Sequence, residues 1–240
     1  MQKYIEFKTE KGTLRGFMHV PEISHYPMCI MFHGFTGNCK GDKFSYVRLA
    51  RMLEKSNVGS LRCDFLGTGE SDLDFYEMTF EEELESARYL VEEMLKRDEI
   101  TELYILGHSM GGAIASEIAK LYPQSISKMV LWAPALNLPE LFSFPVKQDI
   151  IDVWGFEIGR RFIEDIQNRD LFKNLGIYQH PLLIIHGNND QVVDFKISKK
   201  YLQGYHDPIF KVIEKGSHSF DKIEDMAEVL ALSYDFLSCK

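Results

Sequence analysis

The chain has 240 residues, of which 45% are hydrophobic and 26% are charged. These values are ordinary for one large globular domain with a substantial core, and they exclude a disordered chain. The formal net charge is −9, and no block of basic residues is present, which argues against nucleic acid or an anionic membrane surface as a partner.

The beginning of the chain predicts a strand rather than a targeting segment. From Met1 to Lys8 polar and apolar residues alternate, and no apolar run reaches signal-peptide or membrane-spanning length. The cysteines are widely spaced and form no CxxC pair: Cys29, Cys39, Cys63 and Cys239. We interpret them as reduced thiols. We therefore expect a cytoplasmic protein without a metal site.

The first half of the chain predicts strands that then alternate with helices. Strands are predicted at residues 4–8, 13–20, 29–32 and 58–64, the first two joined by a turn at Lys11-Gly12, and a helix is predicted at residues 44–55. The clearest helix follows Thr79, which forms a capping box with Glu82. Its apolar face carries Leu84, Ala87, Val91 and Met94.

The second half of the chain continues this alternation. Strands are predicted at residues 103–106, 128–132, 182–186 and 209–213, and helices at residues 110–121 and 221–237. Buried strands separated by helices of this length indicate a mostly parallel sheet covered on both faces, which is the α/β class.

Residues 135–178 interrupt the alternation. No clear strand is predicted there, and aromatic side chains are frequent: Phe142, Phe144, Trp154, Phe156, Phe162, Phe172 and Tyr178. A long excursion between two strands of a sheet is typical of a functional insertion. We interpret residues 135–178 as a small lid, inserted into a core domain formed by residues 1–134 and 179–240.

The run Gly107-His108-Ser109-Met110-Gly111 carries the main chemical signal. It follows an apolar strand and precedes a helix. A serine on such a sharp strand-to-helix turn is exposed to substrate, and glycines two residues before and after it relieve backbone crowding. The helix that follows contributes free N–H groups at its beginning. We therefore predict that Ser109 is a nucleophile.

A nucleophilic serine needs a base and an acid that orients the base. His218 follows the last predicted strand, and Asp190 follows the strand at residues 182–186. The order Ser, Asp, His is the order used on this type of sheet. Asp194 is the rival acid, but it lies further from the strand end, so we favour Asp190. His186 and His108 are interpreted as structural.

Two N–H groups should stabilise the negative charge that develops on the substrate oxygen, each typically worth about 3–4 kcal/mol. One is the backbone N–H of Met110, directly after the serine. For the other we choose the N–H of Phe35, in the loop His33-Gly34-Phe35-Thr36-Gly37.

With these residues in place, the chain resembles the α/β-hydrolase superfamily over nearly its whole length, and within it the bacterial cinnamoyl and feruloyl esterases. The runs that carry the resemblance are HGFTGN (33–38), DFLGTGESD (64–72), GHSMGG (107–112), WAPA (132–135), HGNND (186–190) and GSH (216–218). The resemblance implies Ser109, Asp190 and His218 as the triad, with Phe35 and Met110 as oxyanion donors. It also suggests Glu140 as the counterpart of the lid residue that holds a phenolic hydroxyl.

These observations predict a serine hydrolase that cleaves carboxylic esters through an acyl-enzyme, without a cofactor. Lid aromatics such as Trp154 would bind an apolar acyl or aryl group, or would only pack the lid. The alternatives are a monoacylglycerol lipase or general carboxylesterase, and a non-catalytic ligand-binding protein of the same fold. The expected partner is a small-molecule ester; neither nucleic acid nor membrane is expected, and a homodimer is left open.

Overall fold

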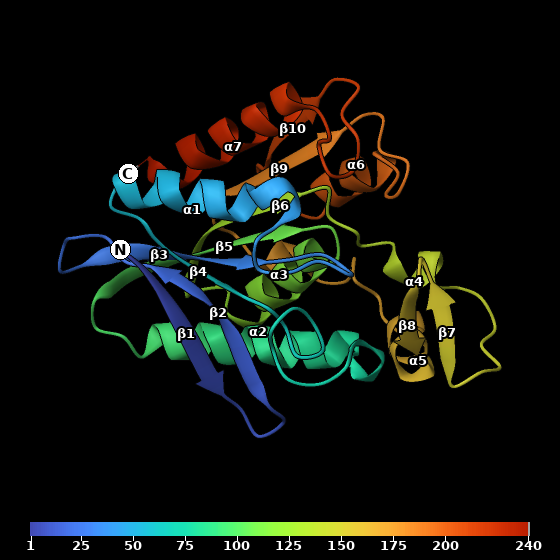
Figure 1. Cartoon of the computed structure of the whole chain (residues 1–240). Coiled ribbons are helices and arrows are strands. Elements are labelled where there is room, and N and C mark those ends of the chain that lie inside the picture. The colour runs from blue at the N-terminus through green and yellow to red at the C-terminus, as the bar shows by residue number, and fades with distance from the viewer. Residues whose placement is uncertain (240) are drawn as a thin grey trace.

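A computed structural model describes residues 1–239 as an α/β sandwich around an eight-stranded sheet (Figure 1). In chain order its strands are β1 (Gln2–Lys8), β2 (Thr13–His19), β3 (Tyr26–Phe32), β4 (Gly59–Cys63), β5 (Ile100–His108), β6 (Ile126–Trp132), β9 (Leu182–Gly187) and β10 (Ile209–Ile213). The predicted strands all lie within two or three residues of these bounds.

The sheet has the spatial order β1-β2-β4-β3-β5-β6-β9-β10. The hairpin β1–β2 is antiparallel and joins the sheet antiparallel to β4, and all the other pairs are parallel. Parallel neighbours need long crossover connections, and the helices supply them. The predicted α/β class with a mostly parallel sheet is confirmed.

Helices cover both faces of the sheet. The core helices are α1 (Ser45–Lys55), α2 (Phe80–Leu95), α3 (Met110–Leu121), α6 (Lys196–Leu202) and α7 (Ile223–Ser238). Figure 1 shows α1 and α7 side by side on one face and α2 and α3 on the other. Each face has its own apolar core: Ile105 belongs to the core beneath α2 and α3, and its neighbour Leu106 to the core beneath α1 and α7.

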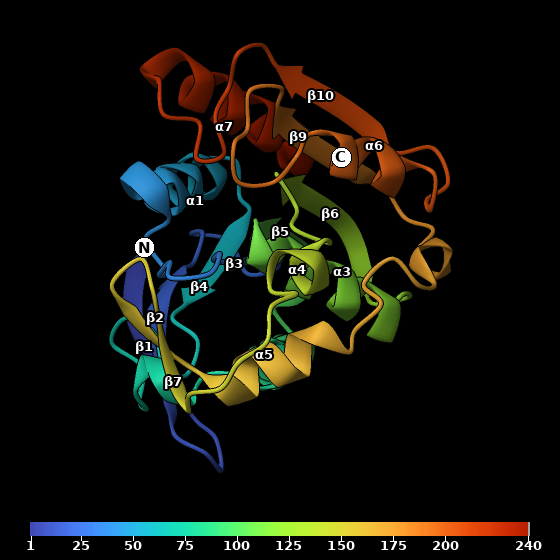
Figure 2. The ribbon, with the colours of Figure 1, turned by 90° about the vertical axis from the view of Figure 1, so that its right-hand side faces the viewer.

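The segment from residue 135 to 178 forms a small layered unit at one end of the sheet, which faces the viewer in Figure 2. It contains α4 (Leu138–Leu141), the antiparallel hairpin of β7 (Ile150–Val153) and β8 (Phe156–Gly159), α5 (Arg160–Gln167) and a 3-10 turn, η3 (Leu175–Ile177). The hairpin corrects the expectation that this segment has no strand. Its strands have only four residues each, which is too short for a clear period-two pattern.

Two further 3-10 turns, η1 (Asp42–Phe44) and η2 (Phe75–Glu77), lie in loops of the first half of the chain. Within residues 1–239, no helix is both long and apolar enough to cross a bilayer. The same residues contain no group of three or more His, Cys, Asp or Glu side chains that could hold a metal ion.

Candidate active site

Ser109 lies on a tight turn between β5 and α3. Its backbone angles, φ 57° and ψ −121°, are outside the regions that residues with a side chain ordinarily adopt. The neighbouring glycines permit this turn. A Cβ on Gly107 would lie 2.1 Å from the carbonyl oxygen of Gly111, and a Cβ on Gly111 would lie 2.1 Å from that of Phe32. The crowding predicted from the sequence is therefore present.

Ser109, His218 and Asp190 form a continuous hydrogen-bonded chain, although 109 residues separate the first two. His218 Nε2 is 2.9 Å from Ser109 Oγ, and His218 Nδ1 is 2.7 Å from Asp190 Oδ2. Since the carboxylate can only accept, His218 Nδ1 carries a hydrogen and Nε2 accepts from the serine hydroxyl. This is the arrangement in which a histidine can take the proton of a serine.

Asp190 is held as an anion. Burial by itself raises the pKa of this carboxyl, but hydrogen bonds from His186 and His218 and from the backbone of Val193 outweigh it and leave the pKa well below its ordinary value. The rival Asp194 is exposed, and its side chain accepts from the N–H of Lys196, at the start of α6. The structure therefore places Asp190, and not Asp194, beside His218.

The loop that carries His218 is fixed by contacts on two sides. Lys43 donates to the Ser219 carbonyl at 3.3 Å and to Asp221 at 2.7 Å, and Ser217 donates to the same carboxylate at 2.6 Å. These contacts connect the loop before α1 to the loop before α7 and limit the movement of His218 between them. The spacing of Lys43 and Asp221 in the sequence gave no sign of this pair.

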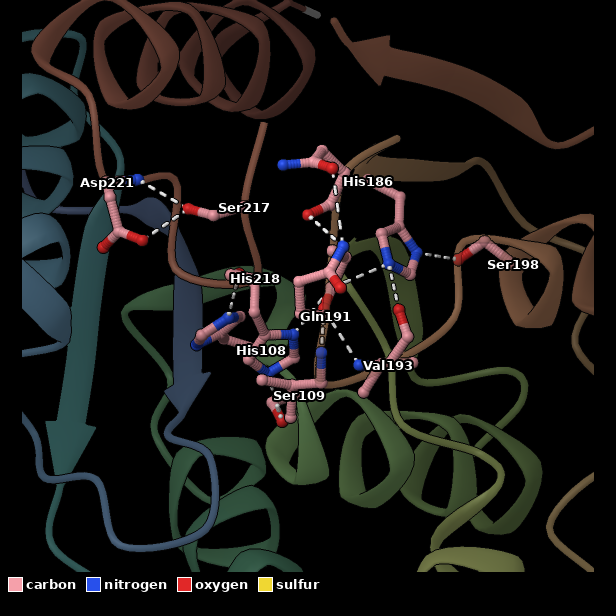
Figure 3. A network of polar contacts seen from close by, with 12 residues as sticks. His108, Ser109, His186, Gln191, Val193, Ser198, Ser217, His218 and Asp221 are labelled. Atoms are coloured by element: carbon pink, nitrogen blue, oxygen red, sulfur yellow. Dashed lines mark hydrogen bonds and ion pairs between the residues drawn. The ribbon is translucent and has the colours of Figure 1, made fainter. Parts of the chain in front are cut away.

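His108 packs against His218. Their ring centroids are 5.0 Å apart, and His108 Nε2 is 3.1 Å from the carbonyl oxygen of His218, to which it donates (Figure 3). Burial, followed by the nearby His218, lowers the pKa of His108 to about 4. His108 is therefore a neutral donor at ordinary pH. This role agrees with its interpretation as structural, although its ring also borders the cavity described below.

The two predicted oxyanion donors belong to Met110, next to the serine, and to Phe35, next to a glycine that approaches the serine. Met110 is the first residue of α3, and Phe35 follows Gly34, whose added Cβ would lie 3.0 Å from the Cβ of Ser109. Neither N–H has a hydrogen-bond acceptor within residues 1–239. His33 shapes the Phe35 loop, because its Nδ1–H donates to the Gly34 carbonyl at 2.9 Å while its Nε2 accepts from the Phe65 N–H at 3.2 Å.

A cavity of about 560 Å³ opens over Ser109 and His218. This volume is in the range of small-molecule sites. The segment 135–178, which we interpret as a lid, supplies an apolar wall: Leu138, Leu141, Phe142, Phe144, Val153 and Trp154. Outside that segment the lining includes the polar side chains of Thr36, Asp42, His108, Gln191 and Ser219 and the apolar side chains of Phe35, Val192 and Val193. Asp42 and Gln191 were not singled out in the sequence, where they are ordinary loop residues next to the predicted motifs.

The two predicted lid contacts have different outcomes. Trp154 lines the cavity from the tip of the β7–β8 hairpin, and its ring centroid is 6.4 Å from that of Phe35. Glu140 is exposed and is not among the cavity residues within the described chain, so its contact with the substrate stays a prediction that the cavity lining does not support. The reason is helix geometry: Leu138 and Leu141 share the face of α4 that borders the cavity, and Glu140 points away from it.

Comparisons with known proteins agree with this fold. Residues 24–155, more than half of the chain, match the family described as Serine aminopeptidase, S33. The structure of Est1E from Butyrivibrio proteoclasticus with bound ferulic acid superposes with a TM-score of 0.88 at 23% sequence identity, covering 98% of this chain and 100% of the other. At this identity the likeness shows the shared fold.

Two curated relatives are similar in sequence. A Mycoplasma genitalium protein named as an esterase or lipase is 27% identical over 232 residues, with 79% of this chain and 81% of the relative covered. The lysophosphatidylserine lipase ABHD12 of Danio rerio is 26% identical over 185 residues, with 74% of this chain covered. The chain spans less than half the length of that lipase, 47%. The match over residues 24–155 shows that the chain belongs to the Serine aminopeptidase, S33 family, and its fold is the α/β-hydrolase fold.

Proposed function

We propose that this protein hydrolyses carboxylic esters through an acyl-enzyme on Ser109. The observation that carries the proposal is the unbroken chain from Ser109 through His218 to Asp190, with distances of 2.9 and 2.7 Å. The serine lies at the floor of a cavity that admits a small molecule, so the reacting oxygen and the substrate space coincide.

The mechanism follows from the positions of the hydrogens. His218 Nε2 takes the proton of Ser109 as its Oγ attacks the ester carbonyl. The N–H groups of Met110 and Phe35 stabilise the oxyanion, and Asp190 stabilises the imidazolium. His218 then donates its proton to the departing alcohol. Water, deprotonated by the same nitrogen, releases the acid from the serine.

The acyl group that suits this site is small and aromatic, or short. The cavity wall formed by the lid is apolar, and three of its side chains, Phe142, Phe144 and Trp154, present aromatic rings. Cinnamoyl- and feruloyl-type acyl groups match this wall in chemistry and size. The fold shared with the ferulate-bound Est1E supports this substrate class by analogy alone.

A second candidate function is hydrolysis of acylglycerols or other lipid esters. It is favoured by the exposed apolar side chains of the lid, among them Leu141, Phe144 and Phe156, which would suit a longer acyl chain. A panel of esters separates the two candidates. We expect a higher kcat/KM on methyl ferulate or coumarate than on a long-chain monoacylglycerol, and the reverse order would favour the lipase.

The nucleophile is tested by Ser109→Ala. Because the attacking atom is removed, turnover of a chromogenic short-chain ester should fall by at least about 10³-fold, while the thermal unfolding temperature stays near that of the wild type. Labelling by a fluorophosphonate should also disappear. An Ser109→Ala variant that retains full activity, or a wild-type protein that the probe does not label, would contradict the proposal.

A further inference from the structure

The carboxylate of Asp190 accepts hydrogen bonds from more groups than His218 alone. His186 Nε2 lies 3.0 Å from the same oxygen, Oδ2, that accepts from His218. The backbone N–H groups of Val192 and Val193 approach the other oxygen, Oδ1, at 2.8 and 2.9 Å. Among residues 1–239, His186 is therefore the one side chain besides His218 that contacts this carboxylate.

The partners of His186 determine where its hydrogen lies. Its Nε2 faces Asp190 Oδ2 and, at 3.2 Å, the carbonyl oxygen of Val193. Both are acceptors, so Nε2 must carry a hydrogen. Its Nδ1 lies 2.7 Å from Ser198 Oγ, on α6. In the neutral ring Nδ1 accepts, and the Ser198 hydroxyl is the donor.

The hydrogen-bonded pair of His186 and Ser198 is completely buried. His186 and Ser198 both have 0% of their surface exposed. A polar atom that lost its partner here would keep the full cost of its desolvation. Figure 3 shows His186 between Ser198 and the residues of the Asp190 loop, and His218 next to Ser109. Hydrogen bonds thus run from Ser198 through His186, and from Ser109 through His218, and both end at one carboxylate oxygen.

We infer that His186, with Ser198 behind it, is a positioning residue that holds the plane of the Asp190 carboxylate so that His218 Nε2 points at Ser109. The two valine N–H groups fix Oδ1, and His186 fixes Oδ2 independently of His218. A carboxylate fixed at both oxygens cannot turn away when His218 moves its proton. As far as catalysis is concerned, this inference rests on the proposed ester hydrolysis.

Two substitutions at His186 separate positioning from packing. His186→Leu fills the space but removes the donor, whereas His186→Gln offers an N–H near the position of Nε2. We expect kcat on a chromogenic ester to fall about 10- to 100-fold in the leucine variant, the usual scale for a lost hydrogen bond to a charged group, with KM within about twofold. The glutamine variant should recover most of this loss. Equal kcat in the two variants, or a change in KM alone, would overturn the inference.

Ser198→Ala tests the second link and keeps the imidazole in place. It should lower kcat less than His186→Leu does, because the ring remains but its tautomer is less fixed. In the His186→Leu background the same alanine substitution should have no further effect, since Ser198 acts through His186. Where the leucine variant does not fold, Ser198→Ala alone decides: reduced kcat at an unchanged unfolding temperature supports the inference, and unchanged kcat overturns it.

The rate of labelling of Ser109 by a fluorophosphonate distinguishes failure of this inference from failure of the proposed function. Labelling needs an activated serine but no ester substrate. If the wild type is labelled but cleaves no ester, the proposed function is wrong, and slower labelling of His186→Leu than of His186→Gln still supports the role of His186. If the wild type cleaves esters and all three proteins are labelled at the same rate, His186 has no positioning role.

Discussion

At the scale of residues, the turn that carries Ser109 depends on glycine because backbone atoms occupy the space of any side chain. The carbonyl oxygens of Gly111 and Phe32 lie in the positions that a Cβ on Gly107 and on Gly111 would need. Backbone cannot move aside as the end of a flexible side chain can. The sequence motif is therefore a packing requirement as much as a chemical one.

Gly107→Ala should consequently destabilise the protein strongly, by more than about 3 kcal/mol, because the new Cβ meets the Gly111 carbonyl oxygen at 2.1 Å. Gly155→Ala is the matched control. Gly155 has a φ of +84° but no atom within 4 Å of an added Cβ, so it should lose only about 1 kcal/mol from backbone strain. Urea denaturation measures both. Equal losses would show that crowding at the turn is unimportant.

The low pKa of Asp190 predicts a pH-dependent contribution to stability. Burial raises this pKa and the hydrogen bonds from His186 and His218 lower it, with a net decrease relative to the unfolded chain. A decreased pKa stabilises the folded state above the unfolded value of about 4, and this contribution is lost as the pH falls below it. Asp190→Asn should therefore be less stable than the wild type at pH 7.

The difference in free energy of unfolding between the wild type and Asp190→Asn should be smaller at pH 3 than at pH 7. Free energies of unfolding from urea denaturation at the two pH values test this, because the difference between the two proteins cancels the titrating groups that do not contact residue 190. A gap between wild type and Asp190→Asn that is the same at both pH values would contradict the assignment of a low pKa to this carboxylate.

At the scale of elements, the lid hairpin brings Trp154 to the cavity. β7 and β8 have four residues each, and the turn between them contains Trp154 with a φ of +57° and Gly155 with a φ of +84°. The ring of Phe35 lies between this hairpin and α5. Its centroid is 6.4 Å from that of Trp154 in the hairpin and 5.2 Å from that of Phe162 in α5. The loop of the predicted oxyanion donor therefore also carries part of the lid packing.

Trp154→Ala should lower kcat/KM for an aromatic acyl ester by about 10-fold, equivalent to about 1.4 kcal/mol, because an aromatic surface for the acyl group is removed. An acetyl ester does not reach this surface and should be little affected. Ile223→Ala on α7 is the control, since Ile223 is 81% exposed and is not a cavity residue. A parallel loss for both esters would argue against an acyl site under the hairpin.

At the scale of the whole molecule, the central strands support the site because both of their faces are buried. Ile105 and Leu106 are adjacent on β5, just before the serine turn, and each is fully buried in a different core. The position of Ser109 is thus set from both sides of the sheet. β10 is an edge strand of the sheet, and its Ile209 is 46% exposed.

Alanine substitutions should reflect this difference. Ile105→Ala and Leu106→Ala should each cost about 2–5 kcal/mol, since a cavity is left in a closely packed region. Ile209→Ala on β10 should cost less than about 1 kcal/mol. Midpoints of urea denaturation give the three values. If Ile105→Ala or Leu106→Ala lowers the free energy of unfolding no more than Ile209→Ala does, the core around that β5 side chain is not closely packed.

Elements whose signals are local could be predicted from the amino-acid sequence. The strands of the large sheet and the longer helices have a hydrophobic pattern that can be read, and the helix at 110–121 was predicted with the bounds that α3 has. Ser109, Asp190 and His218 could be selected because each directly follows a predicted strand. The helix α6, Lys196–Leu202, was not predicted, since seven residues with three lysines show little periodicity.

Features that depend on contacts between distant segments could be seen only in the folded chain. The hairpin of the lid, the outward direction of Glu140 and the ion pair between Lys43 and Asp221 follow from packing that no local pattern records. The contact of His186 with the Asp190 carboxylate is of the same kind: the sequence places the two residues four apart, but the fold of the loop after β9 turns both side chains toward each other in a buried space. Burial and direction are properties of the assembled chain, so the sequence could indicate the chemistry of this site, and its geometry required the fold.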